Sequence, residues 1–175
     1  MSTLSEPHLS RLICELLVGR DADQQGAIDS LIASFGPIEL LTQSEEFDYS
    51  DYYYKEMGSP IFRRLAVFSD LVSPRRLVEI KLKTNELEDL FAEQGRRGVN
   101  IDPELLSEGS LILATGKPAA QRIYLDHGIY AELRLVYQDG NFQPLAWTHP
   151  DYREQQLLGL LSRLREKYLI DRRTR

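Results

Sequence analysis

The order of strand-like and helix-like segments in the first hundred residues constrains this fold more than any other sequence feature. Apolar runs typical of buried strands are expected at 12–18, 38–47, 61–72 and 99–102, the last of them ended by Pro103. One helix stops at Gly36, and a second begins at Ser73-Pro74 and is closed by Gly95. The order strand, helix, strand, strand, helix, strand is the signature of a split βαβ, or ferredoxin-like, sheet.

The second half of the chain is dominated by strand-like segments. They are expected at 110–116, 122–125, 129–137 and 142–147, and turn residues at 126–128 and 139–140 join the last three. A final helix begins near Pro150 and buries Leu157, Leu161 and Leu164. The predicted fold class is therefore α+β: a ferredoxin-like βαββαβ sheet extended by a C-terminal antiparallel meander and a final helix. Residues 11–170 are expected to form one domain, with a frayed N-terminus at 1–10 and a flexible tail at 171–175.

The charge balance limits the expected partners. The 175 residues include 27 acidic and 21 basic side chains, which give a net charge of −6. Because nucleic-acid binding usually needs a basic face, nucleic acid is not an expected partner. No run approaches the roughly 20 apolar residues of a membrane-spanning helix, and the first ten residues lack a signal-peptide pattern. These observations predict a soluble cytoplasmic protein that does not bind a membrane.

Several common chemistries lack their motifs. A phosphate-binding P-loop needs a glycine five residues before its Gly-Lys pair, but Leu111 stands at that position before Gly116-Lys117. The three histidines are scattered, without the close partners that make a zinc site, and no nucleophile elbow supports a catalytic triad. Cys14 lies in a predicted buried strand, where an inert thiol is the expected form.

The polar residues that remain are candidates for a ligand site. Lys81, Asn85 and Glu88 follow one stripe of the second helix at i, i+4 and i+7. The candidate ligand-binding residues are Arg64, Lys81, Asn85, Arg97, Asn100, Lys117, Arg122 and Tyr124, and the candidate metal ligands are Glu88, Asp102 and Glu132. Such mixed charges also arise as structural ion-pair networks, so both interpretations stay open.

Six ordered segments resemble a bacterial family of unknown function, domain-of-unknown-function family 4416. They are DYSDYYYKEMG (48–58), IKLKTNELE (80–88), RGVNIDP (97–103), LATGK (113–117), RIYLDHGIYAE (122–132) and WTHPDY (147–152). The resemblance runs from about residue 12 to 168. Members sometimes carry a GTP-binding label, which the missing P-loop and the missing NKxD motif do not support. In the family pattern many members have histidine at the position of Gln121, and its replacement here weakens any proposal of a general-base histidine beside Arg122.

Two functions are compatible with these residues. The first is a pocket for a phosphorylated or nucleotide-like anion, with Mg²⁺ as a possible cofactor of phosphoryl transfer or hydrolysis. If the charged set is such a site, removing Lys81 or Arg122 leaves folding intact. The alternative is a non-catalytic interaction module, in which Tyr49, Tyr52, Tyr53 and Met57 of loop 48–58 contact a partner protein. The same side chains could instead cover the edge of the sheet.

Overall fold

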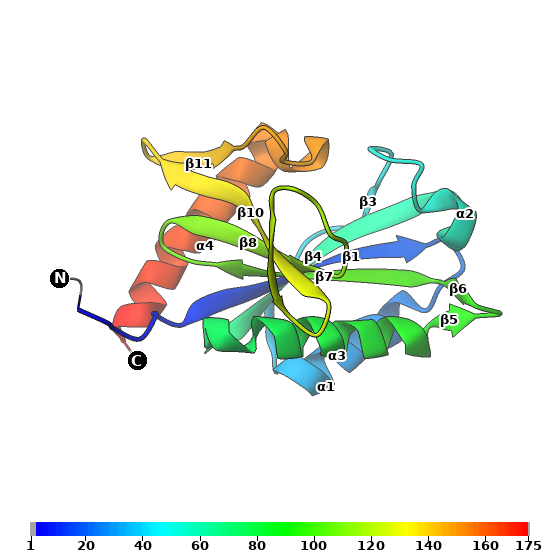
Figure 1. Ribbon diagram of the computed structural model, residues 1–175. Helices are drawn as coiled ribbons and strands as arrows, with labels where there is room; N and C mark the ends of the chain where they lie inside the picture. Colours follow the sequence, from blue (N-terminus) through cyan, green and yellow to red (C-terminus); the bar gives the residue numbers. More distant parts are fainter. Residues whose placement is uncertain (1–2, 175) are drawn as a thin grey trace.

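The computed structural model describes residues 3–174 and shows one large antiparallel sheet with helices on both faces (Figure 1). The strands of this sheet are β1 (Ser10–Gly19), β2 (Ile38–Leu41), β3 (Glu45–Glu46), β4 (Ile61–Val72), β7 (Val99–Leu106), β8 (Ser110–Thr115), β9 (Arg122–Asp126), β10 (Ile129–Gln138) and β11 (Asn141–Pro144). The helices are α1 (Gln24–Phe35), α2 (Tyr54–Met57), α3 (Leu77–Leu90) and α4 (Gln155–Arg173), with short 3-10 helices η1 (Pro74–Arg76) and η2 (Pro150–Arg153).

The strands follow the order β11-β10-β8-β7-β1-β4-β2, with β3 paired to β4 and β9 paired to β10. All of these pairs are antiparallel. The predicted α+β class is confirmed, while the finer assignment to the ferredoxin-like fold stays a prediction. None of the helices in the described residues is long and apolar enough to cross a membrane.

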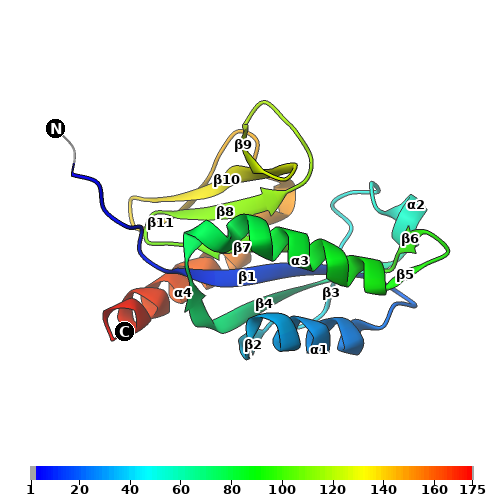
Figure 2. The same ribbon diagram turned by 60° about the horizontal axis from the view of Figure 1, so that its bottom comes forward.

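Strand β1 lies in the middle of the sheet and is buried along its whole length. Because side chains alternate along a strand, its Leu12, Leu16 and neighbouring even positions pack with α1 and α3. Ile13 packs on the opposite face with α4. Figure 2 shows α1 and α3 side by side on one face, with α4 behind the sheet. Two apolar cores therefore cover the two faces of one sheet.

Local sequence signals fix where the first helices begin. Asp23 accepts a hydrogen bond of 2.9 Å from the Gly26 backbone N–H and caps α1. Ser73 accepts from the Arg75 backbone N–H, and Pro74 is the first residue of η1, which continues into α3. The Ser73-Pro74 start was predicted from the sequence.

Two predicted helix ends are wrong. Helix α3 ends at Leu90 rather than near Gly95, because a small hairpin of β5 (Ala92–Glu93) and β6 (Arg96–Arg97) follows it. Helix α4 continues to Arg173, so residues 171–173 belong to a helix and not to a flexible tail. Residues 1–2 and 175, at the ends of the predicted frayed terminus and tail, lie outside the described residues.

Pro103 does not end its strand, because β7 continues through it to Leu106. Pairing between β7 and β8 begins only at Glu104, opposite Leu113. Pro103 therefore stands where β7 has β1 on one side and no strand on the other, and its missing N–H removes no ladder bond.

Strands β7 and β8 diverge beyond this point. Residues 99–102 of β7 pair only with β1, whereas β8 continues to Thr115 in pairing with β10. The sheet opens into two branches, with β4, β1 and β7 on one side and β8, β10 and β11 on the other (Figure 1). This fork positions the candidate site.

Packing against the sheet predicts where substitutions in α3 destabilise the protein. Leu87 is 4% exposed in the core, so Leu87→Ala should lower the free energy of unfolding by about 2–5 kcal/mol. Glu86 is exposed and, within residues 3–174, pairs only with Lys83, so Glu86→Ala should cost under about 0.5 kcal/mol. Urea denaturation measures both, and equal small losses would contradict the assigned buried face.

Candidate functional site

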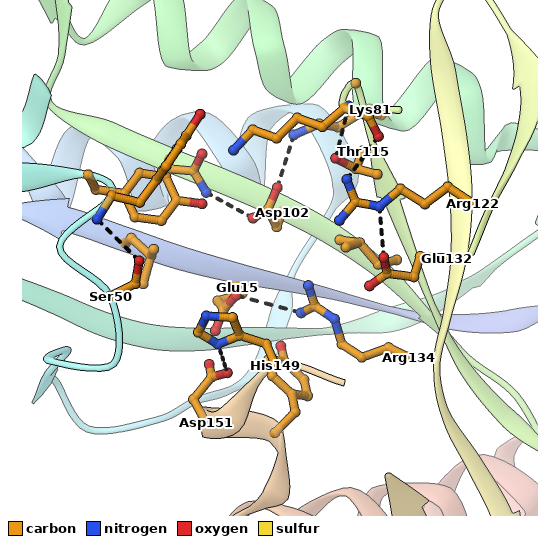
Figure 3. A pocket seen from close by; sticks show the side chains of 18 of the residues that line it. Glu15, Ser50, Lys81, Asp102, Thr115, Arg122, Glu132, Arg134, His149 and Asp151 are labelled. Carbon is orange, nitrogen blue, oxygen red and sulfur yellow. Dashed lines mark hydrogen bonds and ion pairs between the residues drawn. The ribbon is translucent and has the colours of Figure 1, made fainter. Parts of the chain in front are cut away.

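A cavity of about 450 Å³ lies at the fork between the two branches of the sheet (Figure 3). Its lining comes from β1, α3, β7, β8 and β10, from loop residues 47–53 and 115–122, and from residues 147–152 before α4. Five cationic and five anionic side chains line it: Lys81, Arg97, Lys117, Arg122 and Arg134, and Glu15, Glu88, Asp102, Glu132 and Asp151. The partners of each charge decide which of them can reach a ligand.

The α3 wall of the pocket completes the edge of β7. Glu88 Oε1 accepts from the Ile101 backbone N–H at 2.7 Å, and Lys81 Nζ donates to the Ile101 carbonyl at 2.8 Å. Both side chains are buried, with 6% exposure each. Because β8 has left β7 here, these contacts satisfy backbone groups that a neighbouring strand would otherwise pair. Lys81 and Glu88 therefore have a structural role.

An ion-pair network surrounds this wall. Arg97 donates to both carboxylate oxygens of Glu56 at 2.8 Å and to Glu88 at 2.9 Å. The hydrogen bonds from Arg97 lower the pKa of Glu56, whereas burial raises the pKa of Glu88. Asn100 accepts from Arg97 and donates to Asp102. The network ties α2, in the tyrosine-rich loop, to the start of β7.

Asp102 stays ionised in this network. Burial raises its pKa, but the positive charges of Lys81 and Arg134 and the hydrogen bonds from Asn100 and Lys81 bring the pKa below its ordinary value. Lys81 Nζ lies 3.3 Å from the Asp102 carboxylate. Asp102 therefore serves as a counter-ion on the pocket side of β7.

The opposite wall carries Arg122 at the start of β9. Its Nε donates to Glu132 at 2.7 Å, and its Nη1 donates to the Lys117 carbonyl at 2.8 Å. Gln121 also donates to Glu132, at 3.1 Å. These bonds fix the loop that follows β8 against β10.

The floor of the pocket holds a buried acidic cluster around one arginine. Arg134 bonds Glu104 and lies 3.7 Å from Glu15, and all three side chains are buried. Burial raises the pKa of Glu104 to about 7 and raises the pKa of Glu15 well above its ordinary range. One carboxylate oxygen of each glutamate makes no hydrogen bond to the described residues. The cluster thus contains acids that hold protons near neutral pH.

A histidine and an aspartate pair beside this floor (Figure 3). The His149 Nδ1 atom lies 2.5 Å from one oxygen of Asp151, and the other oxygen accepts from Arg63 at 2.9 Å. Asp151 is buried, whereas the His149 side chain is 43% exposed. The imidazole ring stacks on Phe47 with a centroid separation of 6.2 Å.

Lys117 differs from the other pocket cations. Within the described residues it makes no ion pair, and its ammonium lies 4.1 Å from the centroid of the Tyr52 ring and 5.4 Å from that of Tyr53. Lys81, Arg97, Arg122 and Arg134 each contact a carboxylate. Lys117 is therefore the lining cation whose charge is left for a ligand.

The structure brings most of the predicted ligand-binding residues together. Those lining the pocket are Lys81, Asn85, Arg97, Asn100, Lys117 and Arg122. Two others lie elsewhere: Arg64 donates to the Thr42 carbonyl at 2.7 Å, and Tyr124 is 57% exposed and packs against the Tyr130 ring. Period-two spacing placed Tyr124 on the face of Arg122, but the β9 hairpin carries its side chain outside the pocket.

The predicted metal ligands are not arranged as a metal site. Within residues 3–174, no three histidine, cysteine, aspartate or glutamate side chains lie close enough together to hold an ion. Glu88, Asp102 and Glu132 each contact a lysine or an arginine instead. Their carboxylates compensate cations, a role that sequence spacing alone does not distinguish from metal binding.

The tyrosine-rich loop mostly packs against its own part of the sheet. Met57 is buried with Phe47, and Tyr49 and Tyr53 pack against that cluster. Tyr52 is 60% exposed. The predicted partner contact through this loop stays a prediction, with Tyr52 as its main exposed ring.

Sequence reasoning missed the floor residues Glu15, Arg134, His149 and Asp151. A signal was present for Glu15, a charge inside an otherwise apolar buried run. For Asp151 the signal was weak, because its partner Arg63 lies 88 residues away.

The fold and the pocket define an α+β protein with a polar cavity at the fork of an antiparallel sheet. The family model described as "Domain of unknown function (DUF4416)" matches residues 9–168, and the chain belongs to this family. No curated protein and no solved structure matches it. The six-segment resemblance is confirmed, and the chemistry of the pocket rests on its own geometry.

Lys81→Met tests the structural role of the α3 wall. It leaves the Ile101 carbonyl and Asp102 without their cationic partner, and breaking a buried pair costs about 3–5 kcal/mol. This expectation replaces the earlier one that removing Lys81 leaves folding intact. Lys83→Met on the exposed face of α3 is the control, with an expected loss below about 0.5 kcal/mol. A loss below 1 kcal/mol at Lys81 in urea denaturation, roughly the worth of an exposed pair, would show that the contact is dispensable.

The raised pKa of Glu104 predicts how the free energy of unfolding depends on pH. Its pKa of about 7 exceeds the ordinary glutamate value of 4.5, so between these values the folded state holds a proton that the unfolded state has lost. The free energy of unfolding should therefore fall as pH rises through this window, by up to about 1.4 kcal/mol per pH unit from this group. Glu104→Gln should flatten part of that fall between about pH 5 and pH 7.5, while Glu15, whose pKa burial also raises, still contributes to it. An unchanged pH dependence in urea denaturation would contradict the assignment.

Proposed function

We propose that the pocket binds a phosphorylated or nucleotide-like anion. The observation that carries this proposal is the Lys117 ammonium, which lines the pocket and makes no ion pair with the described residues. The rings of Tyr52 and Tyr53 hold it in place through cation–π contact without neutralising its charge. The Lys117 ammonium can therefore donate charge-assisted hydrogen bonds to the oxygens of a phosphate group.

Two further donors support an anionic ligand. The Asn85 side-chain amide lines the same pocket and makes no hydrogen bond within the described part of the chain. Arg122 uses its Nε and Nη1 atoms for internal bonds, which leaves Nη2 for a ligand. The three donors come from α3, from the loop after β8 and from β9. Donors from three elements suit a group with several oxygens, such as phosphate or pyrophosphate.

The organic part of such a ligand has an apolar surface to contact. Tyr52 and Tyr53 line one side of the pocket, and Trp147, 44% exposed, lines it from the segment before η2. Small-molecule sites combine apolar walls with a few convergent polar groups. Mg²⁺ would arrive with the ligand's phosphates, since this ion usually binds proteins through few carboxylates and keeps its other oxygen ligands.

Calorimetric titration with inorganic pyrophosphate and with nucleoside triphosphates, each with and without Mg²⁺, tests the proposal. Lys117→Ala should weaken binding by about 1.5–3 kcal/mol, the value of a hydrogen bond to a charged group. It should lower the melting temperature only slightly, because Lys117 forms no ion pair in the described structure and an exposed cation–π contact contributes about 0.5–1 kcal/mol. Lys83→Ala, on the exposed face of α3, should change neither quantity. Absence of wild-type binding to every probe, or equal binding by Lys117→Ala, would refute the proposal.

A further inference from the structure

His149 presents one free ring nitrogen at the pocket. Its Nδ1 is bonded to Asp151, while its Nε2 makes no hydrogen bond to the described residues. In Figure 3 the ring lies beside Glu15, with its bonded edge toward Asp151 and its other nitrogen toward the cavity. Stacking on Phe47 at an interplanar angle of 16° restrains the plane of the ring.

The contact between His149 and Asp151 orients the imidazole ring and does not cap helix η2. His149 precedes η2, but its side chain makes no capping hydrogen bond to that helix. The Asp151 carboxylate is 2% exposed and is held on its other oxygen by Arg63, itself 9% exposed. A buried carboxylate fixed by a buried arginine therefore orients a half-exposed histidine.

The charges and hydrogen bonds around Asp151 keep its carboxylate ionised, as a hydrogen-bond acceptor for His149 must be. Burial raises its pKa, but the hydrogen bond from His149 and the charges of Arg134 and Arg63 bring it below the ordinary value. An ionised Asp151 accepts a hydrogen bond from Nδ1–H. Neutral His149 then carries its lone pair on Nε2, the atom on the pocket side.

We propose that His149 is a catalytic residue of this pocket, the proton acceptor in hydrolysis of the phosphorylated ligand, and that Asp151 and Arg63 are its positioning residues. This inference rests on the proposed function, because it requires a phosphorus atom held in the pocket. The arrangement matches a general requirement of such chemistry: a base that lines the same pocket as the proposed phosphate donors and is oriented by a second group.

The step balances with water as the co-reactant. His149 Nε2 takes a proton from a water molecule as the water oxygen forms a bond to phosphorus. The bond from phosphorus to the leaving oxygen breaks, and that oxygen keeps the electron pair. Because the leaving oxygen is in line with the attacking water on the far side of phosphorus, it takes its proton from solvent, and the imidazolium returns its proton to solvent, which restores neutral His149.

The first experiment tests the orientation without a substrate. Long-range ¹H–¹⁵N spectra of the labelled protein should show neutral His149 with its proton on Nδ1. Asp151→Asn should abolish this tautomer preference, because an amide can donate to Nδ1 instead of only accepting from it. Asp126→Asn is the matched control, since Asp126 contacts the exposed His127. A wild-type His149 protonated on Nε2 would overturn the inference.

The second experiment measures phosphate release from pyrophosphate, p-nitrophenyl phosphate and nucleoside triphosphates, with and without Mg²⁺. His149→Gln should reduce the rate by about 10²–10⁴-fold, the usual contribution of a general base. It should retain binding of pyrophosphate in calorimetry, and His127→Gln should leave the rate unchanged. Because Asp151 is buried, the melting temperature of Asp151→Asn shows whether this variant still folds. If it does not fold, His149→Gln still tests the inference, because the His149 side chain is 43% exposed.

The outcomes separate this inference from the proposed function. Pyrophosphate binding without release of phosphate from any probe, or release that His149→Gln leaves intact, overturns the catalytic role and leaves anion binding standing. Absence of binding in calorimetry overturns the proposed function, and the catalytic role with it. Release that depends on His149 and persists in His127→Gln supports both.

Discussion

Ile101 presents a backbone N–H and a backbone C=O where β8 has already separated from β7, and the rest of the site depends on how these two groups are satisfied. Unpaired, each would carry the desolvation cost of a buried polar group. Glu88 and Lys81 take the place of the missing strand. The two strands can therefore separate beside α3 without leaving these backbone groups unpaired, and a polar cavity forms between them.

Opening the sheet in this way requires charges to be buried. Glu88 brings a carboxylate to the edge of β7, and Arg97, Lys81 and Asn100 surround it and Asp102 with partners. The network explains why a pocket lined by five cations and five carboxylates is not strongly basic or acidic. Selectivity for an anion then depends on the few donors that the network does not use, above all Lys117.

The sequence predicted local features well and non-local ones poorly. The third expected strand matches β4 at Ile61–Val72, because an apolar run is bounded there by turn residues and Ser73-Pro74. The stripe of Lys81, Asn85 and Glu88 does border the pocket, as helical spacing predicted. Two of these three side chains bond Ile101, and that role depends on where β8 leaves β7, which no local pattern reveals. The prediction that Pro103 ends its strand was wrong for the same reason, since Pro103 lies at the unpaired edge of a strand that continues.

A structure of the protein with pyrophosphate bound tests most directly the division between structural and ligand-binding charges. Phosphate oxygens should lie within hydrogen-bond distance of Lys117 and the Asn85 amide, with the bonds from Lys81 and Glu88 to Ile101 unchanged. Pyrophosphate bonded to Lys81 or Arg97 in place of their carboxylate and backbone partners, or bound outside the fork, would contradict this division.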